Sequence, residues 1–244
     1  ANLPAATSHA SGCRPCLAWL LALPPHLRPP VDRVPSQPRG RRAKVAVGTR
    51  DELLRFGAGG VLAIGPGLGR ADHTMNDIRR VVASADLPIV VDGDALHALD
   101  ARSVSARSAP TIITPHDGEF ATLAGEPPGD DRVDAARDLA RRFGAVVLSK
   151  GPTTVIADPS GEVVLVDHGD DRLATAGSGD VLTGVVTGAV AAGASPMDAA
   201  SMAAWVCAEA GRRCHRHGTI ASDILAAVPL VLDDLLGVPL DRAE

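Results

Sequence analysis

Apolar runs alternate with amphipathic stretches along the chain from about residue 43 onward. The runs are short and consist mainly of Val, Ile, Leu and Ala, a pattern that favours buried strands. Amphipathic stretches such as DDRVDAARDLARRF, at 130–143, favour helices that pack one face against a core. The predicted strands lie at 43–47 and 60–65 and in the apolar parts of 81–96, 109–120 and 130–151.

The later part of the chain predicts a hairpin followed by helices. Within TTVIADPSGEVVLVD, residues 153–167, two apolar runs flank an Asp-Pro-Ser-Gly turn, which is typical of a β-hairpin. From Gly179 onward, the Ala-rich apolar stretches 180–193, 196–214 and 221–236 predict buried helices.

This alternation predicts an α/β fold with a mostly parallel sheet covered by helices on both faces. In such sheets, ligands bind beyond the carboxyl ends of the strands, so polar motifs that follow predicted strands are candidate site residues. Residues 1–43 are rich in Pro, Ser and Arg and show weak periodicity, which is typical of an irregular or disordered segment. We therefore expect an irregular segment at 1–43 and a folded domain at 44–244.

Composition agrees with this fold and argues against several partners. Of the 244 residues 45% are hydrophobic but only 2% are aromatic, so the core must consist of Ala, Val, Leu and Ile. The net charge of −5 indicates neither a nucleic-acid nor an anionic-membrane partner. No apolar run has the length of a membrane span, and the four Cys follow no pattern that demands disulfides. A cytoplasmic protein is expected.

Two polar motifs follow the earliest of these strands. AIGPGLGR, at 63–70, is a Gly-rich loop that either donates amides to a ligand or makes a tight turn. In VVDGDAL, Asp92 and Asp94 come directly after a strand. Asp94 is expected to cap the helix that follows, whereas the role of Asp92 stays open.

Two further motifs place charged side chains at strand ends. ITPHDGEF carries His116 and Glu119, for which we expect substrate contact or an indirect role in binding magnesium rather than a zinc site. LSKGPTTVI carries Lys150, which could neutralise a phosphate that Thr153 and Thr154 also contact. The alternative is a surface lysine beside a turn.

The strongest motif is TAGSGDVLTG, at 175–184. Gly177 and Gly179 leave the backbone amides of a predicted helix N-terminus accessible, and such amides attract phosphate. Asp180 falls in the first turn, where it is either a capping acid or a base that takes a proton from an attacking hydroxyl. Phosphoryl transfer needs an anion site and a base side by side, and this motif supplies both.

Six motifs together carry a resemblance to a known family: GPGLG, DGDAL, TPHDGEF, SKGPTTVI, TAGSGDVLTG and TIASDILAAVP. In this order and spacing they closely resemble the NAD(P)H-hydrate dehydratases, a branch of the ribokinase-like superfamily that also forms the C-terminal domain of bifunctional NAD(P)HX repair enzymes. The resemblance runs from about Val61 to Pro229. It implies a ribokinase-like α/β fold.

The resemblance also implies an activity. A nucleotide phosphorylates the hydroxyl of the hydrated cofactors NADHX and NADPHX, and loss of phosphate then restores NADH or NADPH. Bacterial-type members use ADP and release AMP, whereas eukaryotic members use ATP. Because the sequence is rich in Gly, Ala and Arg, it looks bacterial, and we expect ADP. Mg²⁺ held mainly by phosphates and water, and a homo-oligomeric assembly, are further implications.

Individual residues match the family's functional positions. Asp180 matches the base that activates the hydrate hydroxyl, and Gly177 and Gly179 match the anion hole, with Gly179 close to the nucleotide. The remaining matches are the hydrate-binding positions Gly67 and His116, the nucleotide-binding segment Lys150, Gly151, Pro152, Thr153 and Thr154, and Glu119 in the magnesium and phosphate network.

One departure from the family concerns the beginning of the domain. Family members open it with a Gly-rich strand and helix, of the form KGxxGRVLVVGGS, and the sequence before Lys44 has no counterpart. We therefore expect an N-terminally truncated domain, without the epimerase domain that precedes it in many bacterial members. Two other functions stay open: a small-molecule kinase of the same superfamily, which TPHDGEF argues against, and an inactive nucleotide-binding remnant.

Overall fold

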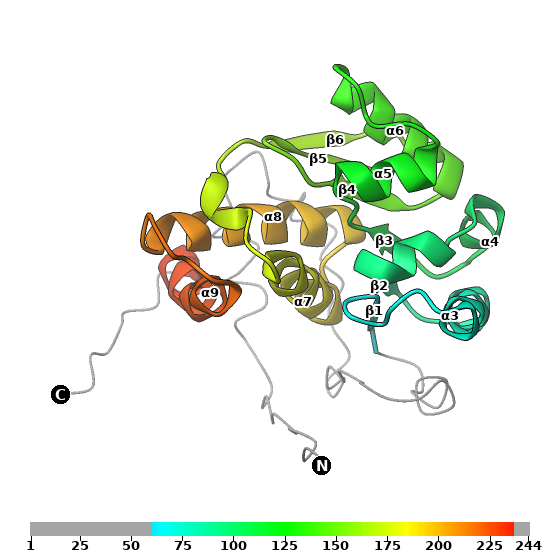
Figure 1. Cartoon of the computed structure of the whole chain (residues 1–244), viewed down its shortest axis with the longest axis horizontal. Coiled ribbons are helices and arrows are strands. Elements are labelled where there is room, and N and C mark those ends of the chain that lie inside the picture. Colours follow the sequence, from blue (N-terminus) through cyan, green and yellow to red (C-terminus); the bar gives the residue numbers. More distant parts are fainter. Residues whose placement is uncertain (1–59, 237–244) are drawn as a thin grey trace, which may run out of the picture.

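The computed structural model describes residues 60–236, which form a sheet between two layers of helices (Figure 1). In these residues the strands lie in chain order across one sheet: β1 Leu62–Ile64, β2 Ile89–Val91, β3 Thr111–Ile113, β4 Val146–Ser149, β5 Thr154–Ala157 and β6 Val163–Val166. β1 to β4 are parallel, whereas β4, β5 and β6 pair antiparallel. The predicted mostly parallel sheet and the predicted hairpin are therefore confirmed.

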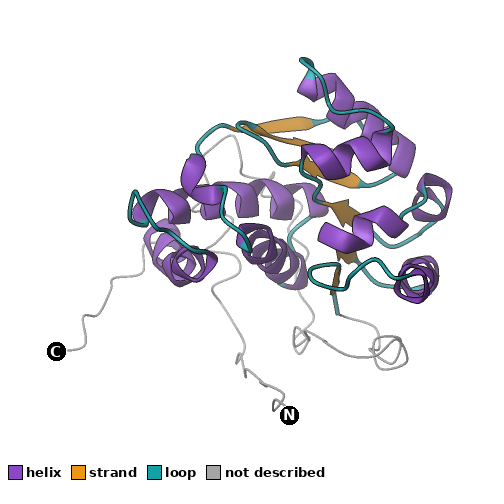
Figure 2. Cartoon of the chain, in the orientation of Figure 1, coloured by secondary structure: helices purple, strands orange, loops and turns teal. Residues whose placement is uncertain are grey.

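Helices cover both faces of the sheet (Figure 2). One layer consists of α7 Ser178–Ala191, α8 Pro196–Arg213 and α9 Ala221–Leu236. The opposite layer consists of α3 Asp72–Ser84, the 3-10 segment η3 Gly93–Ala98, α4 Ala101–Ser105, α5 Asp117–Ala124 and α6 Arg132–Phe143. A second 3-10 segment, η4 Asp171–Leu173, precedes α7. The three helices predicted after Gly179 are confirmed. The helix expected after Asp94 is the short 3-10 segment η3, which begins at Gly93, whereas α4 had no separate prediction.

Alternating residues of each strand pack into two separate hydrophobic cores, because successive side chains on a strand point to opposite faces of the sheet. Val90 packs with α7, α8 and α9, whereas Ile89 and Val91 pack with the other layer. All three residues are at most 1% exposed. β2 is thus buried on both faces, which explains its continuous apolar sequence.

The polar residues that follow the parallel strands meet at one edge of the sheet. Asp92 follows β2, Thr114 follows β3 and Lys150 follows β4, while Gly65 follows β1. Parallel strands all end at the same edge, so residues far apart in sequence come together there. The predicted irregular segment at 1–43 and the predicted strand at 43–47 lie outside the described residues.

Candidate active site

The first turn of α7 presents backbone amides without a side-chain cap. Gly177 is the N-cap residue and has a φ of 89°, a left-handed conformation that favours glycine. The Gly179 amide donates to no acceptor in the part of the chain that the structure describes. Asp180 is the third residue of the helix and is exposed. An acceptor-rich group such as a phosphate could bind these amides with the Asp180 carboxylate beside it.

The first residue of α9 Ala221–Leu236 packs closely against this glycine turn. A Cβ at position 177 would lie 3.1 Å from the Cβ of Ala221, the first residue of α9. The late TIASD motif at 219–223 therefore packs directly against the TAGSGD motif. Asp223 stabilises the start of α9, because its carboxylate accepts a hydrogen bond from the Ile220 amide at 3.0 Å.

The loop before α7 is fastened to α8. The Arg172 guanidinium donates to the Arg212 and Cys214 carbonyls at 2.8 and 3.0 Å and pairs with Asp170. Its hydrogen bonds lower the pKa of the Asp170 carboxyl well below the usual range. The Ser178 hydroxyl donates to the Leu173 carbonyl at 2.6 Å. These contacts fix the path of the chain into the glycine turn.

Asp92 is a buried carboxylate, only 3% exposed, at the centre of the candidate site. Its Oδ1 accepts hydrogen bonds from Lys150 Nζ and Thr114 Oγ1, both at 2.7 Å. Its Oδ2 accepts from Thr183 Oγ1, on α7, at 3.0 Å. Asp92 thus links the ends of β2, β3 and β4 to the helix that carries Asp180.

Lys150 lies next to both this carboxylate and the glycine turn. Its Nζ is 3.7 Å from Glu119 Oε2, in addition to the contact with Asp92. A Cβ at position 179 would lie 3.5 Å from Lys150 Nζ and 3.4 Å from Asp92 Oδ2. The ammonium group therefore lies against the first turn of α7, where it could neutralise a bound phosphate.

His116 and Glu119 form a capping box at the start of α5. The Glu119 carboxylate accepts from the His116 amide at 2.9 Å, and His116 Nδ1 accepts from the Gly118 and Glu119 amides at 3.0 and 3.2 Å. The Glu119 side chain is 7% exposed, whereas that of His116 is 60% exposed. The imidazole is fixed in position and still accessible to a ligand.

The Gly-rich loop after β1 is held against the end of β2. A Cβ on Gly65 would lie 1.6 Å from the Asp92 carbonyl oxygen, so only glycine fits this close approach. The Asp94 carboxylate accepts from the Gly69 amide and from Arg70 Nε, both at 2.9 Å. The expectation that Asp94 caps the following helix is wrong, because its oxygens are engaged by this loop. The Arg70 hydrogen bond, helped by that of Gly69, lowers the Asp94 pKa.

Gly67 lies at the exposed tip of the same loop, with a φ of 68° and no atom within 4 Å of a Cβ placed there.

The predicted nucleotide-binding segment forms the turn from β4 into β5. Gly151 and Pro152 are exposed, and Thr153 and Thr154 are partly buried.

Arg132, on α6, holds the turn between β4 and β5 in place. Its guanidinium donates to the Lys150 carbonyl at 3.0 Å and pairs with Asp117 at 2.8 Å. A Cβ on Gly151 would lie 2.4 Å from Arg132 Nη2, so the turn passes directly over the guanidinium. The backbone next to Lys150 is therefore held by α5 and α6.

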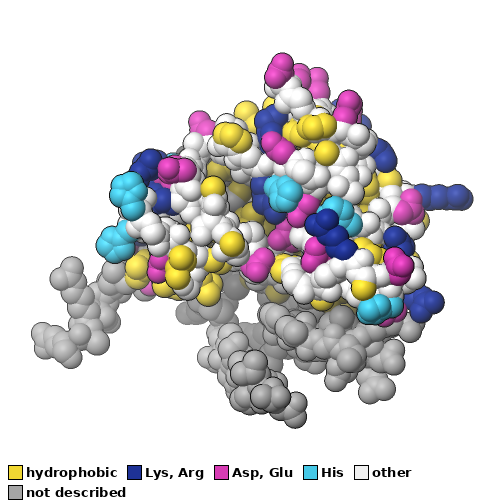
Figure 3. All heavy atoms as spheres, in the orientation of Figure 1, with side chains coloured by type: hydrophobic (Ala, Val, Ile, Leu, Met, Phe, Trp, Pro, Cys, Tyr) yellow, Lys and Arg dark blue, Asp and Glu magenta, His cyan; other side chains and the backbone are white. Residues whose placement is uncertain are grey.

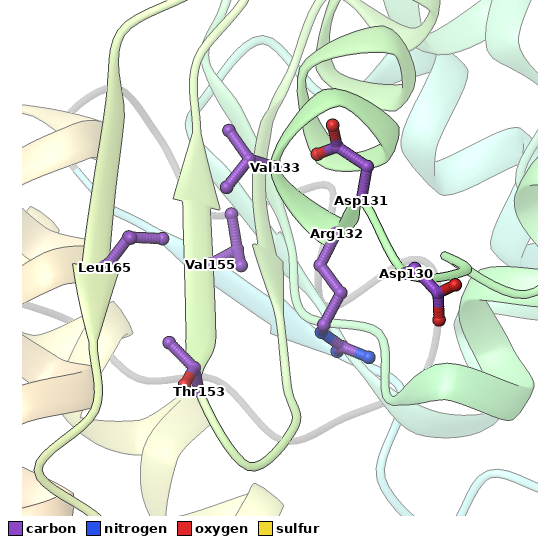
Figure 4. Close-up of a pocket in the computed structure, with 7 residues that line it drawn as sticks. All are labelled: Asp130, Asp131, Arg132, Val133, Thr153, Val155 and Leu165. Atoms are coloured by element: carbon purple, nitrogen blue, oxygen red, sulfur yellow. The ribbon is translucent and has the colours of Figure 1, made fainter.

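A separate open pocket of about 400 Å³ lies between α6 and the hairpin (Figure 4). Val133, Val155 and Leu165 supply its apolar side chains. Asp130, Asp131, Arg132 and Thr153 complete its lining. It shares only Thr153 with the predicted site residues, and none of the residues at the α7 turn line it.

Charged and histidine side chains gather near the middle of the face seen in Figure 3. In the described residues, no group of three or more His, Cys, Asp and Glu side chains is arranged to hold a metal ion. None of the helices in 60–236 has the length and apolar character needed to cross a bilayer.

Asp92, Thr114 and Thr183 are the site residues that the sequence left without a role. For two of them a signal exists, since Asp92 and Thr114 each follow a buried strand directly, as Lys150 does. Thr183 offers no such signal, because it lies in an apolar helix and its partner is 91 residues away.

Comparison with known proteins identifies relatives of the chain. Residues 44–229 match the profile of the NAD(P)H-hydrate dehydratase family. The bifunctional NAD(P)H-hydrate repair enzyme Nnr of Mycobacterium leprae is 52% identical over 149 residues, which is 60% of this chain and 31% of that enzyme. The chain spans about a third of the length of the curated relatives that it matches.

The fold of the chain is also similar to solved structures. The ADP/ATP-dependent NAD(P)H-hydrate dehydratase of Bacillus subtilis, crystallised with ATP and Mg²⁺, is 30% identical with a TM-score of 0.65. The match covers 72% of this chain and 64% of that one. A ribokinase-like superfamily protein of Enterococcus faecalis is 22% identical with a TM-score of 0.63, covering 72% of this chain and 63% of that one. The expected ribokinase-like fold is confirmed.

Proposed function

The chain belongs to the NAD(P)H-hydrate dehydratase family, and from this premise we propose that it repairs hydrated nicotinamide cofactors. NADHX and NADPHX are the proposed substrates, ADP is the phosphoryl donor, and the products are NADH or NADPH, AMP and phosphate. We further propose that the protein acts in the cytoplasm as a homo-oligomer.

One observation carries this proposal: an uncapped helix N-terminus, a lysine and an accessible carboxylate occur at one place. The free Gly179 amide and the Lys150 ammonium lie together, and Asp180 follows in the next position of the helix. Amides and a cation that are fixed in advance stabilise the charge of a phosphoryl group during transfer. A carboxylate next to them can take the proton of the attacking hydroxyl.

The reaction then proceeds in two stages. The hydroxyl oxygen of the hydrated ring forms a bond to the β-phosphorus of ADP, the bond to AMP breaks, and the hydroxyl proton passes to the Asp180 carboxylate. Loss of inorganic phosphate and a ring proton next restores the double bond of the dihydronicotinamide. Asp180 is thus proposed as the base, while the Gly177–Gly179 turn and Lys150 hold the phosphoryl group.

The remaining residues supply binding. We assign Gly151, Pro152, Thr153 and Thr154 to the nucleotide, because they continue directly from Lys150 at the same sheet edge. Gly67 and His116 are assigned to the hydrate. The exposed imidazole of His116 is oriented by α5 amides at Nδ1, so Nε2, which lies 3.5 Å from Glu119 Oε1, is its donor.

The residues fit a magnesium ion that is bound mainly through phosphates and water. Glu119 offers a carboxylate beside Lys150, and the described residues hold no cage of three or more ligating side chains. When bound, Mg²⁺ would neutralise charge on the nucleotide phosphates and orient them. Glu119 is the residue that we assign to this network.

The test is incubation of the purified chain with NADHX or NADPHX, Mg²⁺ and either ADP or ATP, followed at the absorbance band of the reduced nicotinamide. We expect recovery of NADH or NADPH, with AMP as the product from ADP. Folded protein that gives no recovery with either nucleotide would contradict the proposal. A stable phosphorylated product, without recovery of the dihydronicotinamide, would instead support a small-molecule kinase.

A further inference from the structure

Asp92 is a buried acid for which the proposed reaction has no direct use. Its side chain is 4% exposed, and neither carboxylate oxygen is free of donors. Burying a carboxylate is costly unless it is paired and hydrogen-bonded. The protein places an acid here, and the identity of its three donors indicates why.

Each of the three donors comes from a different element. Thr114 follows β3, Lys150 follows β4, and Thr183 lies on α7. Two of these elements carry proposed functional groups: Lys150 is one itself, and α7 carries Gly179 and Asp180. Asp92 therefore contacts both the phosphate-binding lysine and the helix of the proposed base.

Of two nearby carboxylates, Asp92 and Glu119, Lys150 makes its closer contact with Asp92. Lys150 Nζ is 2.7 Å from Asp92 Oδ1 but 3.7 Å from Glu119 Oε2. The Asp92 contact lies on the side of α7, since Asp92 Oδ2 and Lys150 Nζ both lie about 3.5 Å from the Cβ position of residue 179. Without the charge on Asp92, Glu119 would be the remaining carboxylate partner of the Lys150 ammonium. Glu119 lies on α5, so pairing with it would draw the ammonium toward α5 instead of the glycine turn.

The contact with Thr183 fixes the helix. Thr183 is three residues after Asp180 and four after Gly179, so it lies within one turn of both. Its hydroxyl is buried and donates to Asp92, which joins the first turn of α7 to the end of β2. A shift of that turn would move the amides and the carboxylate of Asp180 together.

We propose that Asp92 is a positioning residue for phosphoryl transfer, which holds Lys150 Nζ against the Gly177–Gly179 turn and fixes α7 through Thr183. The inference rests on the proposed function for the identity of the nucleotide. It has two parts: the Lys150 contact acts on nucleotide affinity, whereas the Thr183 contact acts on turnover as well, because α7 carries both the amides and Asp180.

The substitution Asp92→Asn isolates the charge. An Asn can keep all three contacts, because its oxygen accepts from Lys150 and Thr114 while its amide nitrogen donates to the Thr183 hydroxyl. We expect the ADP dissociation constant, measured calorimetrically, to rise about tenfold, as for the loss of a charge-assisted contact. An unchanged or tighter dissociation constant for folded Asp92→Asn protein would overturn the proposal.

A double-mutant cycle with Lys150→Met shows whether Asp92 acts through the lysine. In the Lys150→Met background, Asp92→Asn should have less than about a twofold further effect on ADP affinity. A purely structural role of Asp92 would instead give additive losses. Such additivity would contradict the proposal.

Thr183→Val and Thr114→Val form a matched pair, because each removes one buried hydroxyl donor from the same carboxylate. Thr183→Val should lower kcat at least about tenfold and also weaken ADP binding, since it leaves the lysine paired but frees the α7 turn that carries both the amides and Asp180. The Thr114 hydroxyl contacts neither Lys150 nor α7, so Thr114→Val should lower the melting temperature and change kcat and ADP affinity less than Thr183→Val does. Equal kinetic effects of the two variants would overturn the assignment to α7.

Lysine labelling tests the geometry without any nucleotide. The chain has only two lysines, Lys44 and Lys150, so an amine-reactive reagent and mass spectrometry can follow Lys150 with Lys44 as the internal reference. Asp92→Asn should raise the labelling rate of Lys150 relative to Lys44, whereas Thr114→Val should not. Labelling that is identical in wild type and Asp92→Asn would show that the carboxylate does not hold the lysine.

These outcomes separate the inference from the proposed function. A wild-type chain that binds ADP but does not restore NADH contradicts the function, and the affinity cycle still decides the Lys150 contact. A wild-type chain that is active, with Asp92→Asn equally active and equally reactive at Lys150, contradicts the inference alone.

Discussion

Gly177 and Ala221 meet where the first turns of α7 and α9 come together, and a Cβ on Gly177 would lie 3.1 Å from the Ala221 Cβ. Gly177 also holds a φ of 89°. The conformation and the close neighbour are independent reasons for glycine at this position, and both act on the turn that we assign to phosphate binding.

Gly177→Ala should therefore lower both stability and nucleotide affinity. The left-handed backbone costs a residue with a Cβ about 1–2 kcal/mol, and the contact with Ala221 adds strain that displaces the turn. Chemical denaturation measures the first effect and ADP titration the second. The matched control is Gly125→Ala, where φ is 98° but no atom lies within 4 Å. The control should lose stability and keep its ADP affinity, and equal affinity in the two variants would count against a role of the turn in binding.

Asp180→Asn should abolish most turnover and leave ADP binding nearly unchanged. The substitution removes the proposed base but keeps the backbone of the α7 turn, and general-base catalysis contributes about 10²–10⁴ in rate. Steady-state kinetics with NADHX and calorimetry with ADP measure the two quantities. Asp198→Asn makes the same change in the first turn of α8, where the carboxylate contacts Ser195, and it should leave turnover unaffected. An Asp180→Asn variant with wild-type kcat would remove Asp180 as the base.

Lys150→Met should destabilise the fold, because it leaves the buried Asp92 carboxylate without its cation. Breaking a buried pair in this way costs about 3 kcal/mol or more. Adding Asp92→Asn to this variant should recover a large part of the loss, since the unpaired charge is then gone. Urea denaturation of the two single variants and the double variant tests this. If the double variant is no more stable than Lys150→Met, the ion pair is not what keeps Asp92 buried as a charged group.

The loop before α7 should contribute stability that depends on pH. Hydrogen bonds from Arg172 lower the Asp170 pKa below its ordinary value of 3.8. A lowered folded-state pKa means that the contribution is fully present above the unfolded-state pKa and is lost as the pH falls below it. The difference in melting temperature between wild type and Asp170→Asn should thus be constant near neutral pH and shrink below about pH 4. A difference that grows on acidification would contradict this contact.

Removal of divalent cations should stop turnover without unfolding the protein. The described residues contain no group of three or more ligating side chains, so we expect magnesium to bind with the nucleotide rather than before it. A chelator should abolish recovery of NADH, and added Mg²⁺ should restore it. Without nucleotide, the melting temperature should be the same with the chelator and with Mg²⁺. A large stabilisation by Mg²⁺ alone would point to a metal site built by the protein.

Several elements of this molecule could be predicted from local sequence, because their causes are local. The hairpin at 153–167 follows from two apolar runs and a turn, and the helices after Gly179 follow from long apolar stretches. Gly177, Gly179 and Asp180 could be placed at a helix N-terminus for the same reason. The motif order also indicated the family, to which residues 44–229 belong.

Other features depend on which strand ends become neighbours. Asp94 looked like a helix cap, yet its carboxylate binds Gly69 and Arg70, more than 20 residues earlier in the chain. Helix capping is a local preference, and a loop that the parallel sheet brings close competes with it successfully.

The sequence by itself thus determined the α/β class, the helix N-terminus of the glycine turn and the family of the chain. Only the tertiary structure decided that Asp92 would join Lys150 and Thr183, which are 58 and 91 residues away. The physical reason is that periodicity and turn preferences act over a few residues, whereas the partners of a buried charge are set by the packing of strands and helices. A carboxylate at the end of β2 is accommodated in the interior because the fold surrounds it with three donors.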